Sequence, residues 1–337
     1  MHNVNQYNYL GIVFSSRGRW KTASEMLSCS ANKAVFSLKN MLNKTYNLPV
    51  SQSLKLFDSK ILPILLYGAE LWGAEPDSSL TRIYNNYHKY LLGLPVNCVS
   101  ITAIGELGRP VFQYYCTLKL ISGWLRIINH SSDRYSKLLY YQQYQLAESN
   151  VFSWGLRVKS ILCSLGFSFV WINQGVGDSN NFIEIFKQRL TDVNIQDWLN
   201  VIRTTDSLRS YALFKIDHFT EPYVLYLNNF TLRKAFAQLR CGALDIFVNS
   251  GRKNRLPFNQ RICKYCSVAQ IDDEYHFILI CPFLKDLRSK YIKPFYFVHP
   301  SVDKFIQLMQ SPSKLLCKSI SSFIMSAIEH RKQHSLF

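Results

Sequence analysis

Four residues in the C-terminal part of the sequence have the spacing of a closed metal site. Cys263 and Cys266 form a CxxC pair. His276 follows after nine intervening residues, and Cys281 follows after four more. A two-residue gap lets two thiolates reach one face of a tight turn, and the later pair can complete a tetrahedron. Three thiolates and one imidazole form a soft ligand set that suits Zn²⁺. The spacing predicts a structural zinc site, because four protein ligands leave no position for a reactive water.

Two other interpretations of these residues stay open at this point. The cysteines and the histidine could be unrelated core residues, or the CxxC could be a redox pair. A redox pair is disfavoured, because no βαβ pattern surrounds it. The neighbouring run Asp272–Asp273–Glu274 is not expected to bind two metal ions, since three consecutive side chains cannot all face one ion pair. We expect the run to cap the helix that delivers His276.

The composition points to a folded protein with a polyanionic partner. The chain has 337 residues, of which 48% are hydrophobic and only 18% charged. Such a chain can bury real cores. Its formal net charge is +17, from 39 Lys and Arg against 22 Asp and Glu. Cations that neutralise phosphates release condensed counterions, so the charge favours RNA or DNA as a partner. A merely solubilising surface is the alternative.

The excess of positive charge continues through the segment around the predicted zinc ligands. Between Thr231 and Lys293 there are twelve Lys or Arg and five Asp or Glu, with aromatic residues interleaved. Cations beside stacking aromatic rings are typical of single-strand binding, whereas a solvated charged face is the alternative. We expect Tyr265 to stack on bases. The residues expected to contact nucleic acid through their charge are Arg233, Lys234, Arg240, Arg252, Lys253, Arg255, Arg261 and Lys264.

Hydrophobic periodicity predicts a mainly α fold. Tyr7 to Ser15 alternates and reads as one strand, or half of a hairpin, that needs a partner. Helical spacing begins at Trp20, and a second helix meets Pro63, which should bend or restart it. The segment from Leu62 to Trp72 is apolar nearly all round and should be buried. Further helices follow, and the sequence predicts a small CCHC zinc knuckle followed by helices at the C-terminal end.

Targeting signals and cysteine usage suggest an intracellular protein. The sequence MHNVNQYNYLG has neither the basic region nor the apolar core of a signal peptide. The longest apolar stretch is too short and too interrupted to cross a bilayer, so no membrane partner is expected. Nine cysteines, most of them isolated in apolar stretches, favour a reducing compartment. We expect the nucleus, the cytoplasm or both.

Four stretches of the chain, taken in order, resemble one family. They are YNYLGIVFSSRGRW at Tyr7–Trp20, LFDSKILPILLYGAELWG at Leu56–Gly73, LRCGALDI with GRKNRLPFNQRICKYC before the zinc ligands, and DEYHFILICPFLKDLR at Asp273–Arg288. Together they are similar to the C-terminal part of reverse transcriptases from non-LTR, LINE-type retrotransposons. The middle third of the chain matches only loosely. The resemblance implies a primer-grip-like element at Tyr9, Leu10 and Gly11 and a thumb-like helical region after it.

The resemblance also implies an organisation and an expected activity. The regions expected are a primer-grip-like strand and turn (1–19), a thumb-like helical region (20–133), a helical connector (134–230), a basic lead-in with the CCHC knuckle (231–300), and C-terminal helices (301–337). The paired palm aspartates of the family's polymerases precede the primer grip and are absent here, so no enzymatic activity is expected. A two-metal transfer needs those carboxylates.

Two functional hypotheses follow. In the first, a truncated retroelement protein binds RNA or DNA through basic helices and a zinc knuckle, and an intact retroelement reverse transcriptase is its expected protein partner. No small-molecule substrate is expected. In the second, the chain is a helical protein-interaction scaffold with a zinc-stapled C-terminal domain, and aromatic residues around Tyr84–Tyr90 and Tyr135–Tyr144 form an interface. In either, an N-terminal strand without its sheet would leave that region partly folded.

Overall fold

The chain folds mainly into helices. The computed structural model describes residues 4–16, 18, 20–44, 48–310 and 313–334. Within these described residues, the one sheet is a two-stranded antiparallel ribbon near the N-terminus. The expected fold class, mainly α with a short N-terminal β element and a Cys/His cluster followed by helices, is confirmed.

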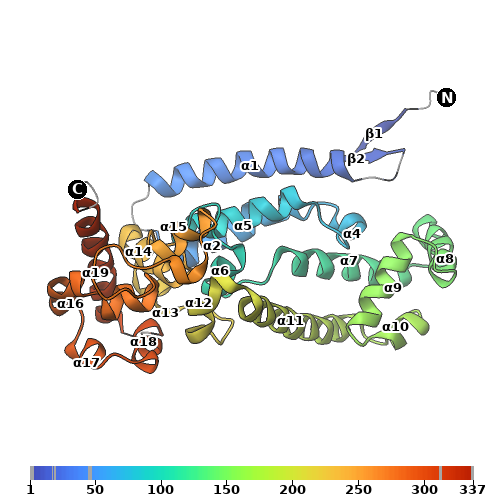
Figure 1. Cartoon of the computed structure of the whole chain (residues 1–337). Helices are drawn as coiled ribbons and strands as arrows, with labels where there is room; N and C mark the ends of the chain where they lie inside the picture. The colour runs from blue at the N-terminus through green and yellow to red at the C-terminus, as the bar shows by residue number, and fades with distance from the viewer. Residues whose placement is uncertain (1–3, 17, 19, 45–47, 311–312, 335–337) are drawn as a thin grey trace. The chain divides into compact units, whose positions relative to one another are not determined.

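The elements follow one another along the chain as Figure 1 labels them. The first are β1 (Gln6–Tyr9), β2 (Ile12–Ser15), α1 (Lys21–Lys44), α2 (Val50–Lys60), α3 (Leu62–Leu65), α4 (Ala69–Trp72), α5 (Ser78–Leu92), α6 (Ser100–Glu106), α7 (Phe112–Ile128), α8 (Tyr135–Glu148), α9 (Trp154–Ser164), α10 (Ser168–Ile172) and α11 (Ser179–Thr204). The rest are η1 (Asp206–Leu208), α12 (Arg209–Phe214), α13 (Pro222–Tyr226), α14 (Phe230–Arg240), α15 (Phe247–Lys253), η2 (Phe258–Gln260), η3 (His276–Ile280), η4 (Pro282–Leu284), α16 (Lys285–Tyr291), α17 (Pro294–Phe297), α18 (Val302–Met309) and α19 (Lys314–Gln333).

These elements pack into two compact units, each assembled from three stretches of chain. Unit 1 comprises Met1–Met41, Lys55–Tyr84 and Pro110–Asp197. Unit 2 comprises Leu42–Leu54, Asn85–Arg109 and Trp198–Phe337. The units cut across the five regions expected from the sequence, and those regions stay a prediction. The zinc ligands predicted from the sequence all belong to unit 2.

The N-terminal strands form a complete hairpin (Figure 1). Tyr9 pairs with Ile12, which leaves Leu10 and Gly11 as a two-residue turn. Both turn residues have positive φ, 49° and 81°, as in the type I′ turn that suits the twist of paired strands. The expectation of one strand that lacks its partner is therefore wrong. Tyr9 and Leu10 lie exposed at the hairpin tip, while residues 1–3, 17 and 19 of the same predicted region lie outside the described residues.

The apolar segment after α2 is broken into two short helices. Pro63 lies in the first turn of α3, so the helix restarts there, as the sequence predicts. Gly68 has a φ of 71° and separates α3 from α4. Tyr67 and Leu71 are 45% and 37% exposed, so the segment is not buried all round. The left-handed glycine turns the chain and brings these two side chains to the surface.

The core of unit 1 is built on stacked aromatic side chains. Trp124 of α7 stacks on Trp171 of α10, with ring centroids 6.1 Å apart. Its indole N–H donates to the Tyr140 hydroxyl at 2.9 Å, which ties α7 to α8. Helix α9 approaches α8 closely at Gly155, where a Cβ would lie 2.4 Å from the carbonyl oxygen of Gln143. The helices α7 to α10 thus share one aromatic core.

The core of unit 2 contains a buried network of charges. The guanidinium of Arg240 on α14 donates to both carboxylate oxygens of Glu106, at 2.8 and 3.0 Å. It also pairs with Glu221 at 3.0 Å, and Glu221 in turn pairs with Lys215. Burial alone would raise the pKa of Glu106, but Arg240, together with Lys215 and Tyr223, lowers it overall. This network joins α6, α13 and α14 inside the unit.

Among the described residues, the structure contains no helix whose length and apolar character would suffice to cross a bilayer.

Replacing Glu106 with Ala tests the buried network. The change leaves Arg240 only partly compensated in a dry core, and breaking one partner of such a pair costs about 3–5 kcal/mol of stability. We expect urea unfolding to show a loss of that size for Glu106→Ala. The matched control is Glu329→Ala, at an exposed position of α19, which should stay within about 0.5 kcal/mol of the parent. Equal stability of the two variants would contradict the role of the network.

Candidate metal centre

The four residues singled out by their spacing meet at one point in unit 2. One donor atom from each of Cys263, Cys266, His276 and Cys281 lies within 4.8 Å of all the others. The Sγ atoms of Cys263 and Cys281 are 3.9 Å apart. The Sγ atom of Cys266 lies 3.5 Å from Nε2 of His276. The cluster can therefore hold a metal ion.

These separations agree with the edges of a metal-centred tetrahedron. Bond lengths of about 2.3 Å to sulfur and 2.0 Å to nitrogen give edges of about 3.8 Å between sulfurs and about 3.5 Å between sulfur and nitrogen. The donor set is three sulfurs and one nitrogen. Cys263, His276 and Cys281 are buried, and Cys266 is partly exposed.

A short antiparallel hairpin presents the first two ligands. The N–H of Cys263 donates to the carbonyl of Gln270 at 2.8 Å, and the N–H of Asp272 donates to the carbonyl of Arg261 at 2.9 Å. Ile262 and Ile271 form the bridge between these bonds. Cys266 lies in the turn that follows Cys263. The backbone ladder thus holds Cys263 in position, with Cys266 in the adjoining turn.

A π-helical turn delivers the other two ligands. Residues five apart point about 140° away from each other on an α-helix. The turn η3 instead closes an N–H to carbonyl bond from Cys281 to His276 at 2.8 Å, which is the five-residue step of a π-helix. Both ligands then lie on the same side of the turn. The wider π-helical turn thus allows His276 and Cys281, five residues apart, to face the same point.

Each residue of the acidic run has a separate structural partner. Asp273 Oδ1 accepts from the N–H of His276 at 2.8 Å, so the expected cap of the ligand-bearing turn is confirmed. Asp272 accepts from the N–H of Phe247 at 2.8 Å, at the N-terminus of α15. Glu274 accepts from the Ser210 hydroxyl at 2.7 Å. The three carboxylates point to different parts of the unit and do not converge on one site.

Residues beyond the four ligands orient the cluster and balance its charge. Nδ1 of His276 lies 3.3 Å from Oε1 of Gln270, a contact that leaves Nε2 as the nitrogen facing the sulfurs. Arg331 of α19 contacts the Sγ atoms of both Cys263 and Cys281 at 3.8 Å. The same guanidinium makes two bonds, of 2.9 and 3.0 Å, to Asp272. A buried cation therefore adjoins two of the thiol groups.

The pKa values of the two buried thiols, Cys263 and Cys281, are shifted in opposite directions. The pKa of Cys281 lies well below its ordinary value, first because it accepts a hydrogen bond from Cys263 and then because of His276 and Arg331. The pKa of Cys263 is raised by its contact with Cys281 and by burial.

Two of the cations expected to bind nucleic acid are buried instead. Arg240 is 1% exposed and belongs to the charge network of unit 2. Arg233 is 5% exposed, and its guanidinium donates to the carbonyls of Leu91 and Leu227 at 3.1 and 2.7 Å. The prediction that these two side chains face a polyanion is therefore wrong. They lie on the inner face of the amphipathic helix α14, where carboxylates and carbonyls take up their donors.

The other predicted contacts differ in how far they reach solvent. Arg261 is partly buried and donates to the carbonyls of Leu256 and Val248. Tyr265 is partly buried, stacks on Phe283 with centroids 5.5 Å apart, and lies under the guanidinium of Arg331. Its ring is thus engaged within the protein. Exposed or half-exposed positions are held by Lys234, Arg252, Lys253, Arg255 and Lys264.

Sequence reasoning missed three residues near this centre. Arg331 lies 50 positions beyond Cys281, and Gln270 is a polar loop residue. Arg209, in the first turn of α12, places its guanidinium 3.6 Å from the ring centroid of Phe258. Gln270 and Arg209 carry no local signal, because each acts through packing across the fold. Arg331 belongs to the basic last turn of α19, with His330 and Lys332, which indicates an anionic neighbour.

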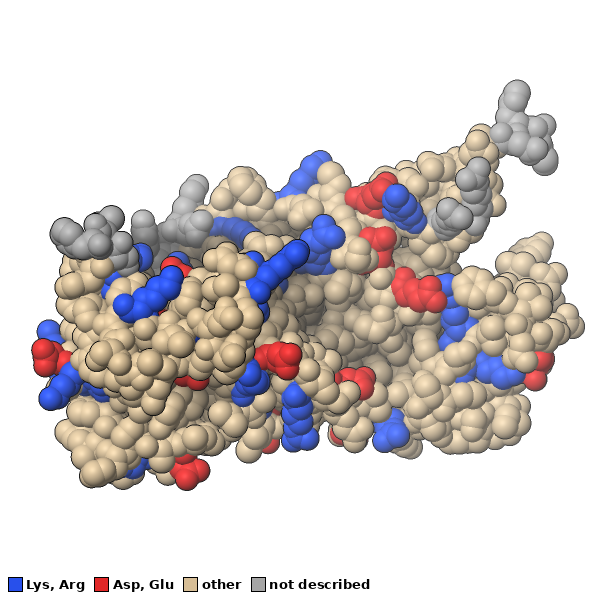
Figure 2. All heavy atoms as spheres, in the orientation of Figure 1, with Lys and Arg blue, Asp and Glu red and all other residues tan. Residues whose placement is uncertain are grey.

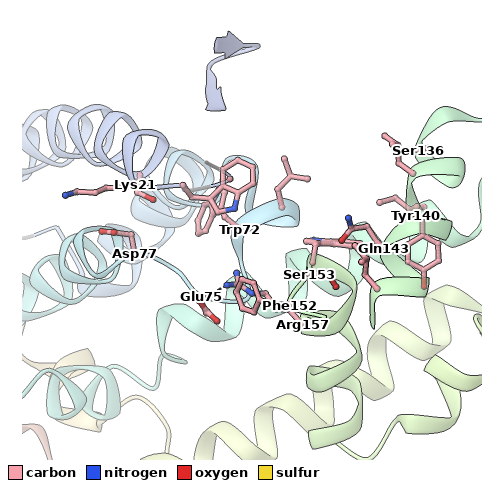
Figure 3. A pocket seen from close by; sticks show the side chains of 18 residues that line it. Lys21, Trp72, Glu75, Asp77, Ser136, Tyr140, Gln143, Phe152, Ser153 and Arg157 are labelled. Atoms are coloured by element: carbon pink, nitrogen blue, oxygen red, sulfur yellow. Dashed lines mark hydrogen bonds and ion pairs between the residues drawn. The ribbon is translucent and has the colours of Figure 1, made fainter. Parts of the chain in front are cut away.

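Unit 1 contains a separate cavity of about 1000 Å³. Figure 3 shows Arg157, Glu75 and Phe152 together within it and Tyr140 and Gln143 of α8 along one side. Arg157 pairs with Glu75 at 2.9 Å and lies over the ring of Phe152 at 4.5 Å. The cavity is lined by aromatic and apolar side chains with a few charged groups. None of the sequence-predicted site residues lines it.

Removing two ligands tests the metal centre. Purified protein should contain about one equivalent of metal by elemental analysis, and Cys263→Ser with Cys266→Ser should abolish it. Cys29→Ser with Cys163→Ser, at two exposed free cysteines, is the control and should retain the metal. A parent protein with no metal, or a control that loses metal to the same extent, would contradict the assignment of the site.

Comparisons with known proteins add no identification. The chain matches no protein-family model, no curated protein and no solved structure. The geometry of the Cys₃His cluster and of its surroundings therefore carries the functional conclusion.

Proposed function

We propose that this chain binds single-stranded RNA or DNA through a basic surface that a structural zinc ion holds in place. The observation that carries the proposal is the convergence of three cysteines and one histidine within 4.8 Å. Zinc is the metal we propose, because thiolate and imidazole ligands in a tetrahedron suit it best among common intracellular ions. Four protein ligands close the coordination sphere, so the ion would be structural rather than catalytic.

The metal centre is linked directly to the helix that carries exposed cations. Asp272, in the ligand hairpin, accepts from the N–H of Phe247, and its carbonyl accepts from the N–H of Val248 at 3.1 Å. These two bonds hold the N-terminus of α15. Lys253 ends that helix, and Arg255 follows it. A metal that fixes the hairpin would thus fix the direction in which these cations point.

The exposed charges support contacts at individual residues rather than binding across one broad patch. On the face drawn in Figure 2, Lys and Arg occur singly or in small groups, with Asp and Glu between them. Part of the net charge of +17 is internal, since Arg233 and Arg240 are buried. We therefore assign the phosphate contacts to Lys253, Arg255 and Lys264, which are exposed near the metal centre. Contacts to phosphates supply affinity without sequence preference.

The resemblance noted in the sequence supports a retroelement origin for this proposal. A helical region that precedes a Cys₃His cluster has the order of the thumb and knuckle in non-LTR reverse transcriptases. On this basis we propose an intracellular nucleic-acid-binding protein without polymerase activity of its own, able to act beside an intact enzyme. Exposed free thiols at Cys29 and Cys163 are in keeping with a reducing compartment.

Salt dependence of binding tests the proposal. Fluorescence anisotropy with a labelled single-stranded RNA should show that the logarithm of the binding constant falls linearly with the logarithm of salt concentration, with a slope of about −0.7 per phosphate contact. Replacing Lys253, Arg255 and Lys264 together with Gln should weaken binding and make that slope shallower by about two units. Each lost cation removes one site of counterion release.

The control for this titration is Lys318→Gln, an exposed lysine of α19. It should change neither the affinity nor the slope appreciably. An absence of binding at low salt, or binding that salt leaves unchanged, would refute the proposal. A metal-free double cysteine variant that still binds normally would separate nucleic-acid binding from the metal centre.

A second candidate function, a helical scaffold for protein partners, is favoured by α8. This helix exposes large apolar side chains, and its neighbour Phe152 is 74% exposed. Contiguous exposed apolar groups mark interaction surfaces. The exposed residues of α8 are Tyr135, Leu138, Leu139, Tyr141 and Leu146.

Self-association of nuclease-treated protein tests the scaffold. If α8 joins copies of this chain, sedimentation at high micromolar concentration should show a dimer that Leu138→Glu with Leu139→Glu dissociates. The control is Leu315→Glu, at a leucine that is 78% exposed on α19. A parent protein that stays monomeric throughout would count against this surface as an interface between copies.

A further inference from the structure

A second cavity lies in unit 2, beside the cations assigned to nucleic-acid contact. Its volume is about 580 Å³, within the range of small-molecule sites, about 300–1,000 Å³. One wall is the loop between α5 and α6, with Asn97 and Cys98, and another is the connection from α14 to α15. Arg252 and Lys253, at the end of α15, also line it. The cavity is therefore partly cationic.

Positive charge is concentrated around Arg252. The guanidinium of Arg209 lies 3.6 Å from the ring centroid of Phe258, and that of Arg261 lies 6.0 Å from the same centroid. Burial lowers the pKa of Arg252, and the charges of Arg261 and Arg209 lower it further, against the opposing effect of Glu274. The charges of Arg209 and Arg261 thus add to the positive potential at Arg252. An anion bound at Arg252, which lines the cavity, would relieve this repulsion.

The rest of the lining suits a polar ring system. Asn97 is exposed, and its amide has both donors and an acceptor. Asp245 is also exposed at the cavity and can accept from an amino group. Burial raises the pKa of Cys98, so its thiol is neutral and adds no repulsion to an anion. Apolar contact comes from side chains such as Val99 and Leu244.

We propose that this cavity takes one nucleotide unit, with its phosphate on Arg252 and Lys253 and its base among Asn97, Val99 and Asp245. The inference rests on the proposed function, because it places one unpaired nucleotide of the bound strand in a defined site. The same chemistry would accept a free mononucleotide. Unpaired bases that leave the stack are commonly recognised in this way by single-strand-binding proteins.

Two variants change the cavity in different ways. Ala243→Phe fills it without altering charge, since Ala243 lines it and is partly exposed. Arg252→Gln removes the central cation. Asn97→Trp, at an exposed lining residue, is a second filling variant in case Ala243→Phe does not fold. Lys318→Gln, at an exposed lysine that does not line the cavity, is the control. Circular dichroism and metal content show which variants keep the fold.

The experiment measures single-stranded RNA binding by anisotropy, with adenosine 5′-monophosphate and inorganic phosphate as separate competitors. We expect Arg252→Gln and a folded filling variant each to weaken RNA binding about tenfold, as for loss of one charge-assisted hydrogen bond or one held base. Lys318→Gln should bind as the parent does. Adenosine 5′-monophosphate should compete, and inorganic phosphate should compete less well.

The outcomes separate the cavity from the broader proposal. If the parent binds RNA and the folded cavity variants bind equally well, the cavity inference is overturned and RNA binding stands. If inorganic phosphate competes as well as the mononucleotide, the site takes a phosphate alone, and the base pocket is overturned. If the parent does not bind RNA, the proposed function fails. In that case calorimetry with the mononucleotide decides the cavity, and binding lost in Ala243→Phe would support a free-nucleotide site, whereas no binding would overturn it.

Discussion

The contact of Arg331 with Asp272 and with two cysteine sulfurs connects the main parts of unit 2. The guanidinium donates to both oxygens of Asp272 and adjoins Cys263 and Cys281. Asp272 at the same time holds the N-terminus of α15. Through one buried ion pair, the C-terminal helix α19, the ligand hairpin and the cation-bearing helix are fixed to one another. A metal bound at the cluster would further stabilise this junction, since metal binding and folding are coupled in small Cys/His sites.

The burial of several arginines reduces the part of the net charge that is available at the surface. A net charge of +17 suggests a surface made for a polyanion, yet Arg233, Arg240 and Arg331 are at most 5% exposed. Inside unit 2 these side chains satisfy carboxylates and backbone carbonyls. Arginine suits such positions because its planar fork donates several bonds at once. The proposed nucleic-acid surface therefore depends on a smaller set of exposed cations near α15.

The sequence predicts some features of this structure well and others poorly, for physical reasons. The ligand set was predictable, because Cys263, Cys266, His276 and Cys281 lie within twenty residues and metal geometry restricts their spacing. The cap by Asp273 was predictable for the same local reason. The π turn that joins His276 to Cys281 was not predicted, because π turns are rare and occur mostly as single-turn departures within α-helices.

Features that depend on distant partners could not be predicted. Arg240 reads as an exposed cation on an amphipathic helix, and only the fold reveals Glu106, 134 positions away. Arg331 lies 68 positions from Cys263. The N-terminal hairpin was missed because Leu10–Gly11 lacks the usual Asn-Gly or Asp-Gly signal of a type I′ turn. For the two arginines, a partner outside the local window decides where the side chain goes. For the hairpin, the partner strand is adjacent in sequence, and only the turn signal was lacking.

X-ray absorption spectroscopy at the zinc edge tests most directly whether the Cys₃His cluster binds zinc through four protein ligands. We expect a first shell of three sulfurs at about 2.3 Å and one nitrogen at about 2.0 Å. A shell dominated by oxygen or nitrogen, a fifth ligand from water, or a spectrum that Cys281→Ser leaves unchanged would contradict it.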